Sequence, residues 1–83
     1  MPDAAAIAAT VRAGLARGLG VDERALSPET DLYDDLGAVS LSVMEVLCTL
    51  EDELGIELPE SNSFALGLRT VRDVVAAFET RAA

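Results

Sequence analysis

The residue types that most often carry out chemistry are scarce in this 83-residue chain. It has no histidine and no lysine, so it lacks the commonest general base, the usual zinc ligand and the amine of Schiff-base catalysis. Its single thiol, Cys48, has no histidine to activate it and falls within a predicted helix, so we expect it to be buried in the core. The sequence therefore predicts a protein that is not itself an enzyme.

An acidic loop before residue 40 offers the next candidates. Asp31, Tyr33 and Asp35 alternate as in a calcium-binding EF-hand loop. However, Tyr33 stands at its third position, Leu36 where that loop needs glycine and Ser42 where it needs glutamate. Asp34 and Asp35 are candidates for a hydrolytic carboxylate pair, yet neighbours in sequence rarely converge on one substrate. We expect neither a metal site nor a hydrolase.

Ser40 is the remaining candidate, because it lies where this loop meets a predicted helix. Taken alone, its simplest role is an N-cap, whose hydroxyl accepts a backbone N–H of the helix. The elements that position it are predicted to be helices, and no strand or repeat is indicated. Two of these helices lie before and directly after the loop.

The first helix is predicted to begin after the N-cap Asp3 and to stop near residue 18, with Gly14 allowing a close helix contact. The next is predicted over residues 40–54, ending at Gly55. Its apolar spacing is carried by Leu41, Met44, Leu47, Leu50 and Leu54. The connection between them, residues 19–39, is expected to pack onto the core, with a short turn at 22–26; its apolar residues are Val21, Leu26, Leu32, Tyr33 and Leu36.

Two further helices complete the prediction. A short one is expected over residues 61–66, and a last one follows the N-cap Thr70, with Asp73 in its first turn. The fold class predicted is all-α: a small four-helix bundle with three longer helices, one short helix and a long loop between the first and second. We expect residues 1–83 to form one domain.

The charge of the chain is concentrated in its middle. The formal net charge is −9, and residues 22–60 hold twelve acidic residues against Arg24 alone. This balance repels nucleic acid and anionic membranes and favours partners with basic surfaces. The lone cysteine, together with an N-terminus that lacks a basic, apolar leader, predicts a cytoplasmic protein.

Three segments then point to a family. The chain reads Asp-Asp-Leu-Gly-Ala-Val-Ser-Leu over 34–41, Leu-Glu-Asp-Glu-Leu-Gly-Ile-Glu-Leu-Pro over 50–59, and Thr-Val-Arg-Asp-Val over 70–74. These resemble the free-standing acyl carrier proteins of fatty-acid and polyketide synthesis. The motifs of that family are Asp-Leu-Gly-x-Asp-Ser-Leu, a later Leu-Glu-acid-acid segment ending in Ile-Pro, and Thr-Val-x-Asp-Val.

The resemblance implies that Ser40 is the attachment serine for 4′-phosphopantetheine. A separate phosphopantetheinyl transferase would donate it from coenzyme A, using magnesium, and the thiol of the arm would carry acyl groups as thioesters. Ketosynthases, acyltransferases and other acyl-processing enzymes with basic patches would then dock on a monomeric carrier. The resemblance places eight residues in that docking surface: Asp34, Asp35, Leu41, Met44, Glu45, Glu51, Asp52 and Glu57.

The chain departs from the family pattern in two places. Val39 replaces the aspartate that precedes the serine, and we predict that Val39→Asp speeds loading by a transferase of primary metabolism. The stretch 61–68 is more apolar than its counterpart in the family. Its residues either complete the core or wall an acyl pocket, whose candidates are Val43, Leu47, Phe64, Leu66, Leu68 and Val71. Both departures favour a dedicated polyketide or natural-product pathway, such as antibiotic biosynthesis, over housekeeping fatty-acid synthesis.

Two alternatives stay open. A peptidyl or aryl carrier would share the fold, although its motif usually reads Gly-Gly-x-Ser, where this chain has Gly37, Ala38 and Val39 before Ser40. An unmodified acidic helical adaptor would use Ser40 only as an N-cap and would never gain a pantetheine arm.

Overall fold

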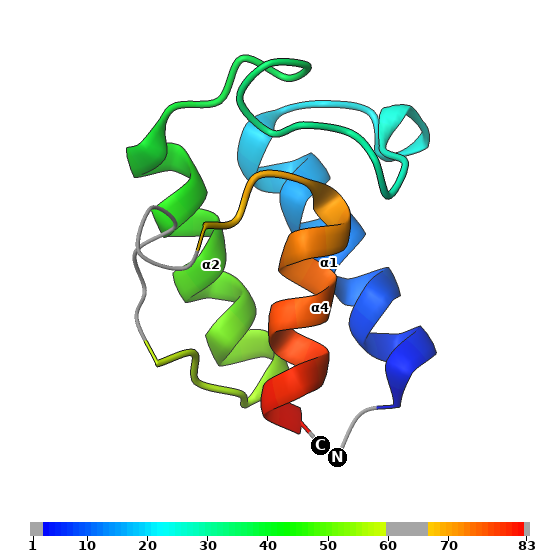
Figure 1. The fold of residues 1–83 in the computed structure, drawn as a ribbon, viewed down its shortest axis with the longest axis vertical. Coiled ribbons are helices and arrows are strands. Elements are labelled where there is room, and N and C mark those ends of the chain that lie inside the picture. Colours follow the sequence, from blue (N-terminus) through cyan, green and yellow to red (C-terminus); the bar gives the residue numbers. More distant parts are fainter. Residues whose placement is uncertain (1–2, 60–66, 83) are drawn as a thin grey trace.

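The architecture is helical throughout the part of the chain that the structure, a computed structural model, describes: residues 3–59 and 67–82. Three α-helices, α1 (Ala4–Leu19), α2 (Ser40–Leu54) and α4 (Val71–Ala82), are joined by loops that include one 3₁₀ turn, η1 (Glu23–Ala25). Figure 1 shows the helices alongside one another, with the long loop over one end and both termini at the other. The all-α prediction is confirmed for these residues, and the short helix expected at 61–66 lies outside them.

Helix α1 is the central packing element, since it contacts both α2 and α4. The carboxylate of Asp3 accepts the N–H of Ala6 at 2.8 Å, so the predicted N-cap is confirmed. The helix ends at Leu19, near residue 18 as predicted, and Gly20 after it takes the left-handed conformation with φ 69°. Its buried stripe is the predicted one, Ile7, Val11 and Leu15, with Gly14 between them.

Two glycines of α1 allow its close contact with α2. A Cβ added at Gly14 would lie 2.6 Å from Cδ2 of Leu50, and one added at Gly18 would overlap Cγ2 of Val46. Both distances are far shorter than van der Waals contact. The close approach predicted at Gly14 is confirmed, and Gly18 extends it by one turn.

Helix α2 begins at Ser40 and ends before Gly55, as predicted. Its buried face is rotated from the predicted stripe: Leu41 is exposed and Met44 only half-buried, whereas Val43 and Val46 are buried. The side of the helix that packs on α1 is marked by Val46, which faces Gly18, and by Leu50, which faces Gly14. Spacing alone could not choose between two neighbouring apolar stripes on one helix.

The loop of residues 20–39 is packed against the core, as predicted. Leu26 and Leu32 are buried, and Val21, Tyr33 and Leu36 are half-buried against the same core cluster. The loop is also bonded to the start of α4: the N–H of Leu32 donates to the carbonyl of Arg69 at 2.7 Å, and the N–H of Val71 to that of Thr30 at 3.1 Å. These bonds fix the chain that leads into Ser40.

Helix α4 begins with a reciprocal cap. The hydroxyl of Thr70 accepts the N–H of Asp73, and the carboxylate of Asp73 accepts the N–H of Thr70, both at 3.1 Å. The predicted cap is therefore confirmed. Three side chains of this helix enter the core, namely Val71, Val74 and Phe78.

Candidate functional site

Ser40 is the first residue of α2 and is half-buried. The N-cap is the preceding residue, Val39, which has an extended backbone and whose carbonyl accepts the N–H of Val43 at 3.1 Å. The reading of Ser40 as an N-cap is therefore wrong by one position. The hydroxyl of Ser40 has no hydrogen-bond partner among the described residues, so it does not cap the helix.

The start of α2 leaves backbone donors free. Within residues 3–59 and 67–82, the N–H groups of Ser40, Leu41 and Ser42 have no hydrogen-bond partner, and no side chain caps this end. The first turn also carries no acidic residue. Free N–H groups and the positive end of the helix dipole favour an anion at this point. A phosphodiester on Ser40, as the resemblance implies, fits the donors that are present.

The acidic loop before Ser40 is held by its own carboxylates. One oxygen of Asp31 accepts the N–H groups of Tyr33 and Asp34, each at 2.8 Å, and the carboxylate of Asp35 accepts the N–H of Asp31 at 2.7 Å. The N–H donated by Asp34, then that of Tyr33 and the charge of Arg69, lower the pKa of Asp31 below its ordinary value. Asp31 is thus a structural residue of this loop.

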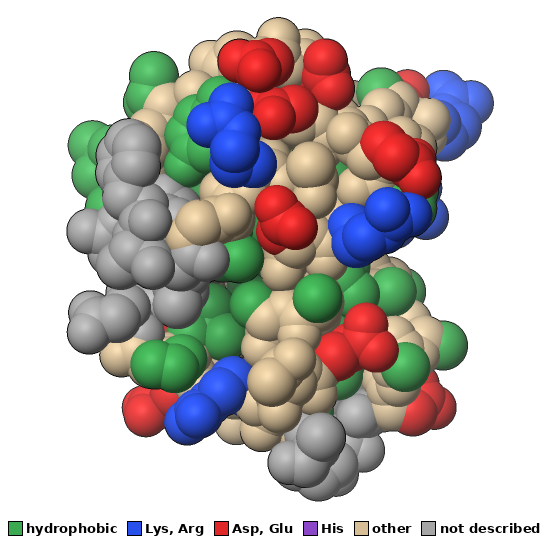
Figure 2. Space-filling model, in the orientation of Figure 1, with side chains coloured by type: hydrophobic (Ala, Val, Ile, Leu, Met, Phe, Trp, Pro, Cys, Tyr) green, Lys and Arg blue, Asp and Glu red, His purple; other side chains and the backbone are tan. Residues whose placement is uncertain are grey.

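Arg69 brings a positive charge to the same loop. Its guanidinium lies 3.2 Å from the carboxylate of Asp31, 3.5 Å from that of Asp34, and 5.1 Å from the ring centre of Tyr33. Asp34 is still 79% exposed. Figure 2 shows basic side chains lying beside acidic ones on the face that carries α4. No local pattern predicts this contact, because 38 residues separate Arg69 from Asp31.

The outward face of α2 carries four of its exposed side chains: Leu41, Glu45, Cys48 and Asp52. Their spacing of four, three and four residues puts them on one side of the helix. The prediction that Cys48 is buried is therefore wrong. At 100° per residue, Cys48 lies on the same side of α2 as Glu45 and Asp52, and not on the side of the buried Leu47. The spacing of Cys48 from Glu45 and Asp52 could have predicted its exposure. The prediction of a buried thiol gave more weight to the apolar character of cysteine.

Two further docking candidates, Glu51 and Glu57, differ in how available their carboxylates are. The carboxylate of Glu51 accepts the N–H of Leu58 at 2.8 Å, which ties α2 to the segment after it. Glu57 is exposed, and its carbonyl accepts a hydrogen bond from Arg81 at 3.3 Å. The structure therefore separates Glu45 and Asp52, on the outward face of α2, from Glu51, whose carboxylate is bonded inside the protein.

Four candidates for an acyl pocket lie together in the core. They are all buried in one cluster: Val43, Leu47, Leu68 and Val71. The other two, Phe64 and Leu66, lie outside the described residues. The four candidates that the structure describes therefore pack against one another in the core.

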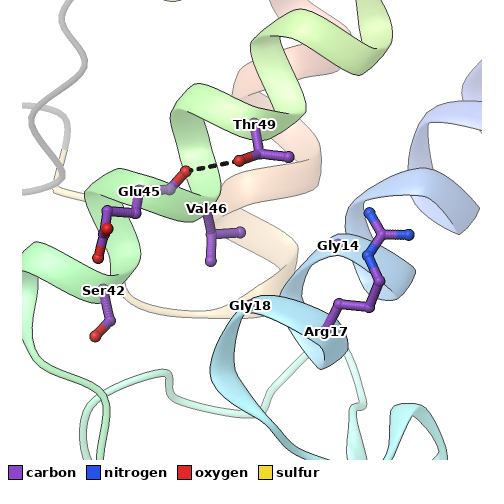
Figure 3. A pocket seen from close by; sticks show the side chains of 7 residues that line it. All are labelled: Gly14, Arg17, Gly18, Ser42, Glu45, Val46 and Thr49. Atoms are coloured by element: carbon purple, nitrogen blue, oxygen red, sulfur yellow. Dashed lines mark hydrogen bonds between the residues drawn. The ribbon is translucent and has the colours of Figure 1, made fainter.

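A hollow of about 260 Å³ lies between α1 and α2, and the sequence did not predict it. Figure 3 shows Val46 pointing from α2 toward Gly18, while the side chain of Glu45 is directed away from α1. The hydroxyl of Thr49 donates to the carbonyl of Glu45 at 3.1 Å. Gly14, Arg17 and Gly18 line it from α1, and Ser42, Glu45, Val46 and Thr49 line it from α2.

The part of the chain that the structure describes has neither a metal site nor a membrane-spanning helix. No group of three His, Cys, Asp or Glu residues there is placed to hold a metal ion. None of the helices described has the length and apolarity needed to cross a membrane.

Comparison with known proteins agrees with the motif around Ser40. The family model for the phosphopantetheine attachment site matches residues 9–78, which run from α1 into α4 and contain Ser40. The chain is also similar to a protein of Syntrophobacter fumaroxidans (strain DSM 10017 / MPOB) named acyl carrier protein. The two are 39% identical over 72 residues, which cover 87% of this chain and 86% of the relative.

Proposed function

The chain belongs to the phosphopantetheine-dependent acyl carrier proteins, and from this premise we propose that it carries acyl intermediates on an arm attached to Ser40. Members of this family are carriers and not enzymes, and 4′-phosphopantetheine is their cofactor. The observation that carries the choice of Ser40 is its place: a half-buried serine with an unbonded hydroxyl, at a helix start with free N–H groups.

Ser40 is the acceptor in the loading step. The bond from its oxygen to phosphorus forms as the pyrophosphate bond of coenzyme A breaks, the nucleotide leaves, and the hydroxyl proton passes to the transferase or to solvent. The N–H groups of Leu41 and Ser42 are then available to the phosphodiester oxygens. When bound, the arm supplies a thiol on which acyl groups are held as thioesters.

The partners proposed are a phosphopantetheinyl transferase and acyl-processing enzymes such as a ketosynthase or acyltransferase. Their basic patches would meet Glu45 and Asp52, with Leu41 and Met44 as apolar contacts near the arm. Four other acidic candidates would add to the negative electrostatic potential that attracts the partner: Asp34, Asp35, Glu51 and Glu57. Exposed ion pairs contribute only about 0.2–1 kcal/mol each, which suits a carrier that binds quickly and leaves quickly.

The finer assignments stay predictions. From the departures at Val39 and 61–68 we propose a polyketide or natural-product pathway, with housekeeping fatty-acid synthesis as the second candidate. A monomer in the cytoplasm, a single carrier domain over 1–83 and the full four-helix bundle are expected from the sequence and the family. The acyl pocket is proposed with its six candidates, and simple core packing is the competing role for them.

The test is the intact mass of the purified protein after incubation with coenzyme A, magnesium and a broad-specificity phosphopantetheinyl transferase. We expect a gain of one phosphopantetheine in the natural chain and none in Ser40→Ala. Ser42→Ala is the matched control, because it removes a hydroxyl from the same turn of α2 and should leave the gain unchanged. If several transferases add no phosphopantetheine to the natural chain, the unmodified adaptor becomes the better interpretation.

A further inference from the structure

Two exposed apolar side chains flank Ser40. Val39 is 61% exposed and Leu41 is 66% exposed, and no other large apolar side chain in the described residues is as open. Isolated apolar residues on a surface are ordinary, but here the two residues enclose the one proposed modification site. Any enzyme that reaches the Ser40 hydroxyl must approach both of them.

Val39 also works against the stability of its own helix. It occupies the N-cap of α2, where serine, threonine, aspartate or asparagine would accept a backbone N–H, and valine leaves that N–H unbonded. Its side chain gains little from burial in return. Packing and helix capping therefore give no reason for an apolar residue at this position.

The acidic residues that precede Val39 in the loop already have partners within the protein. The carboxylate of Asp34 is paired with Arg69 at 3.5 Å, and that of Asp35 accepts the N–H of Asp31 at 2.7 Å. The first turn of α2 has no acidic residue, so Glu45 is the first acid along the helix. Along α2 itself, negative charge therefore begins more than one turn after Val39.

We propose that Val39 is a specificity-determining contact for the enzyme that loads Ser40. That enzyme covers Val39 and Leu41 with an apolar surface, and it places its cations one turn further along, opposite Glu45. The inference rests on the proposed function and adds the chemistry of the loading partner. It makes the residue before the serine an apolar contact where the family motif has an acidic one.

The experiment begins with a panel of phosphopantetheinyl transferases that includes a broad-specificity enzyme and one from primary fatty-acid metabolism. Each is assayed with coenzyme A, magnesium and the natural chain, and the one with the highest kcat/KM is used for the variants. Val39→Asp should lower kcat/KM by about tenfold or more, mainly through KM, the scale on which apolar pockets discriminate small changes. The transferase of primary metabolism should load the same variant faster than it loads the natural chain.

The variant Val39→Thr distinguishes a contact with the transferase from an effect on the stability of α2. Threonine has nearly the shape of valine but adds a hydroxyl that can cap α2, so it should hold or raise the Tm while lowering kcat/KM about threefold to tenfold. Ala5→Asp is the charge control: residue 5 is exposed in the first turn of α1, and the added acid there should leave loading within about twofold.

The outcomes separate the inference from the function on which it rests. If the best transferase loads Val39→Asp as fast as the natural chain or faster, the transferase does not recognise an apolar residue at position 39. The inference is then wrong. Unchanged loading of Val39→Thr with a higher Tm would equally overturn it. If no transferase loads the natural chain while a known carrier is loaded in parallel, the proposed function itself fails, and the inference fails with it.

Discussion

The guanidinium of Arg69 lies 3.2 Å from the carboxylate of Asp31, which stands 38 residues earlier and also accepts two backbone N–H groups of its own loop. One charged contact therefore joins the start of α4 to the loop that leads into Ser40. The backbone bond from Leu32 to Arg69 lies beside it. The position of the proposed loading site thus depends on a residue far from it in the sequence.

The first prediction concerns this contact. Arg69→Gln should speed hydrogen exchange of the amides in residues 31–38 and lower the Tm by about 2–5 °C, since it removes two ion pairs and a ring contact. Arg72→Gln is the matched control, because among the residues that the structure describes Arg72 makes one ion pair, an exposed one with Glu29 at 3.0 Å. It should leave those amides unchanged. Equal exchange in the two variants would show that Arg69 does not hold the loop.

The second prediction concerns the contact between α1 and α2. Gly18 is exposed and helical, where alanine would normally stabilise, yet its Cβ would overlap Val46. Gly18→Ala should therefore lower the free energy of unfolding by about 1–3 kcal/mol, measured by denaturant titration. In a Val46→Ala background the overlap is absent, and the same change should be neutral or stabilising. An equal loss in both backgrounds would refute the steric explanation.

The third prediction concerns acid stability. The N–H of Arg69, then that of Thr70, lower the pKa of Asp73 below the ordinary aspartate value of about 3.9. The stabilisation from this carboxylate is therefore complete above that value and is lost as the pH falls through the lower folded-state pKa. Asp73→Asn should lower the Tm at pH 7 and reduce the further loss on acidification to pH 2. Glu79→Gln, an exposed acid of the same helix, should change neither quantity appreciably.

The fourth prediction concerns docking on α2. The double change Glu45→Gln with Asp52→Asn should lower kcat/KM for loading by about threefold to tenfold at low salt, mainly through KM. The difference should shrink as salt is added, because exposed charges are screened. Glu23→Gln with Glu79→Gln removes the same charge from exposed positions outside α2 and should have little effect. A similar loss in both double variants would mean that total charge, and not this face, guides the partner.

The fifth prediction follows from the exposure of Cys48. Iodoacetamide should add one carboxamidomethyl group to the folded natural chain, seen by intact mass, without a change in the circular dichroism of its helices. Cys48→Ser should take up none and should keep nearly the same Tm, since no core contact is lost. Reaction only in the presence of denaturant would place the thiol in the core after all.

Local rules made much of the fold predictable. Asp3 and Thr70 cap their helices through short-range bonds, and Gly20 and Gly55 end theirs in a left-handed conformation that other residues rarely adopt. These signals act over three or four residues, so the chain shows them directly. The proposal of Ser40 as the attachment site rests instead on the resemblance of residues 34–59 to the family motifs.

The sequence by itself therefore determined the helices, the loop that packs between them and the serine at the junction. Only the tertiary structure decided which side of α2 is buried, and so moved Cys48 and Leu41 to the surface. It alone brought Arg69 to Asp31 and Gly18 against Val46. The physical reason is that these contacts depend on the rotation and spacing of whole helices, which are set by packing between segments far apart in the chain and not by the periodicity of any one of them.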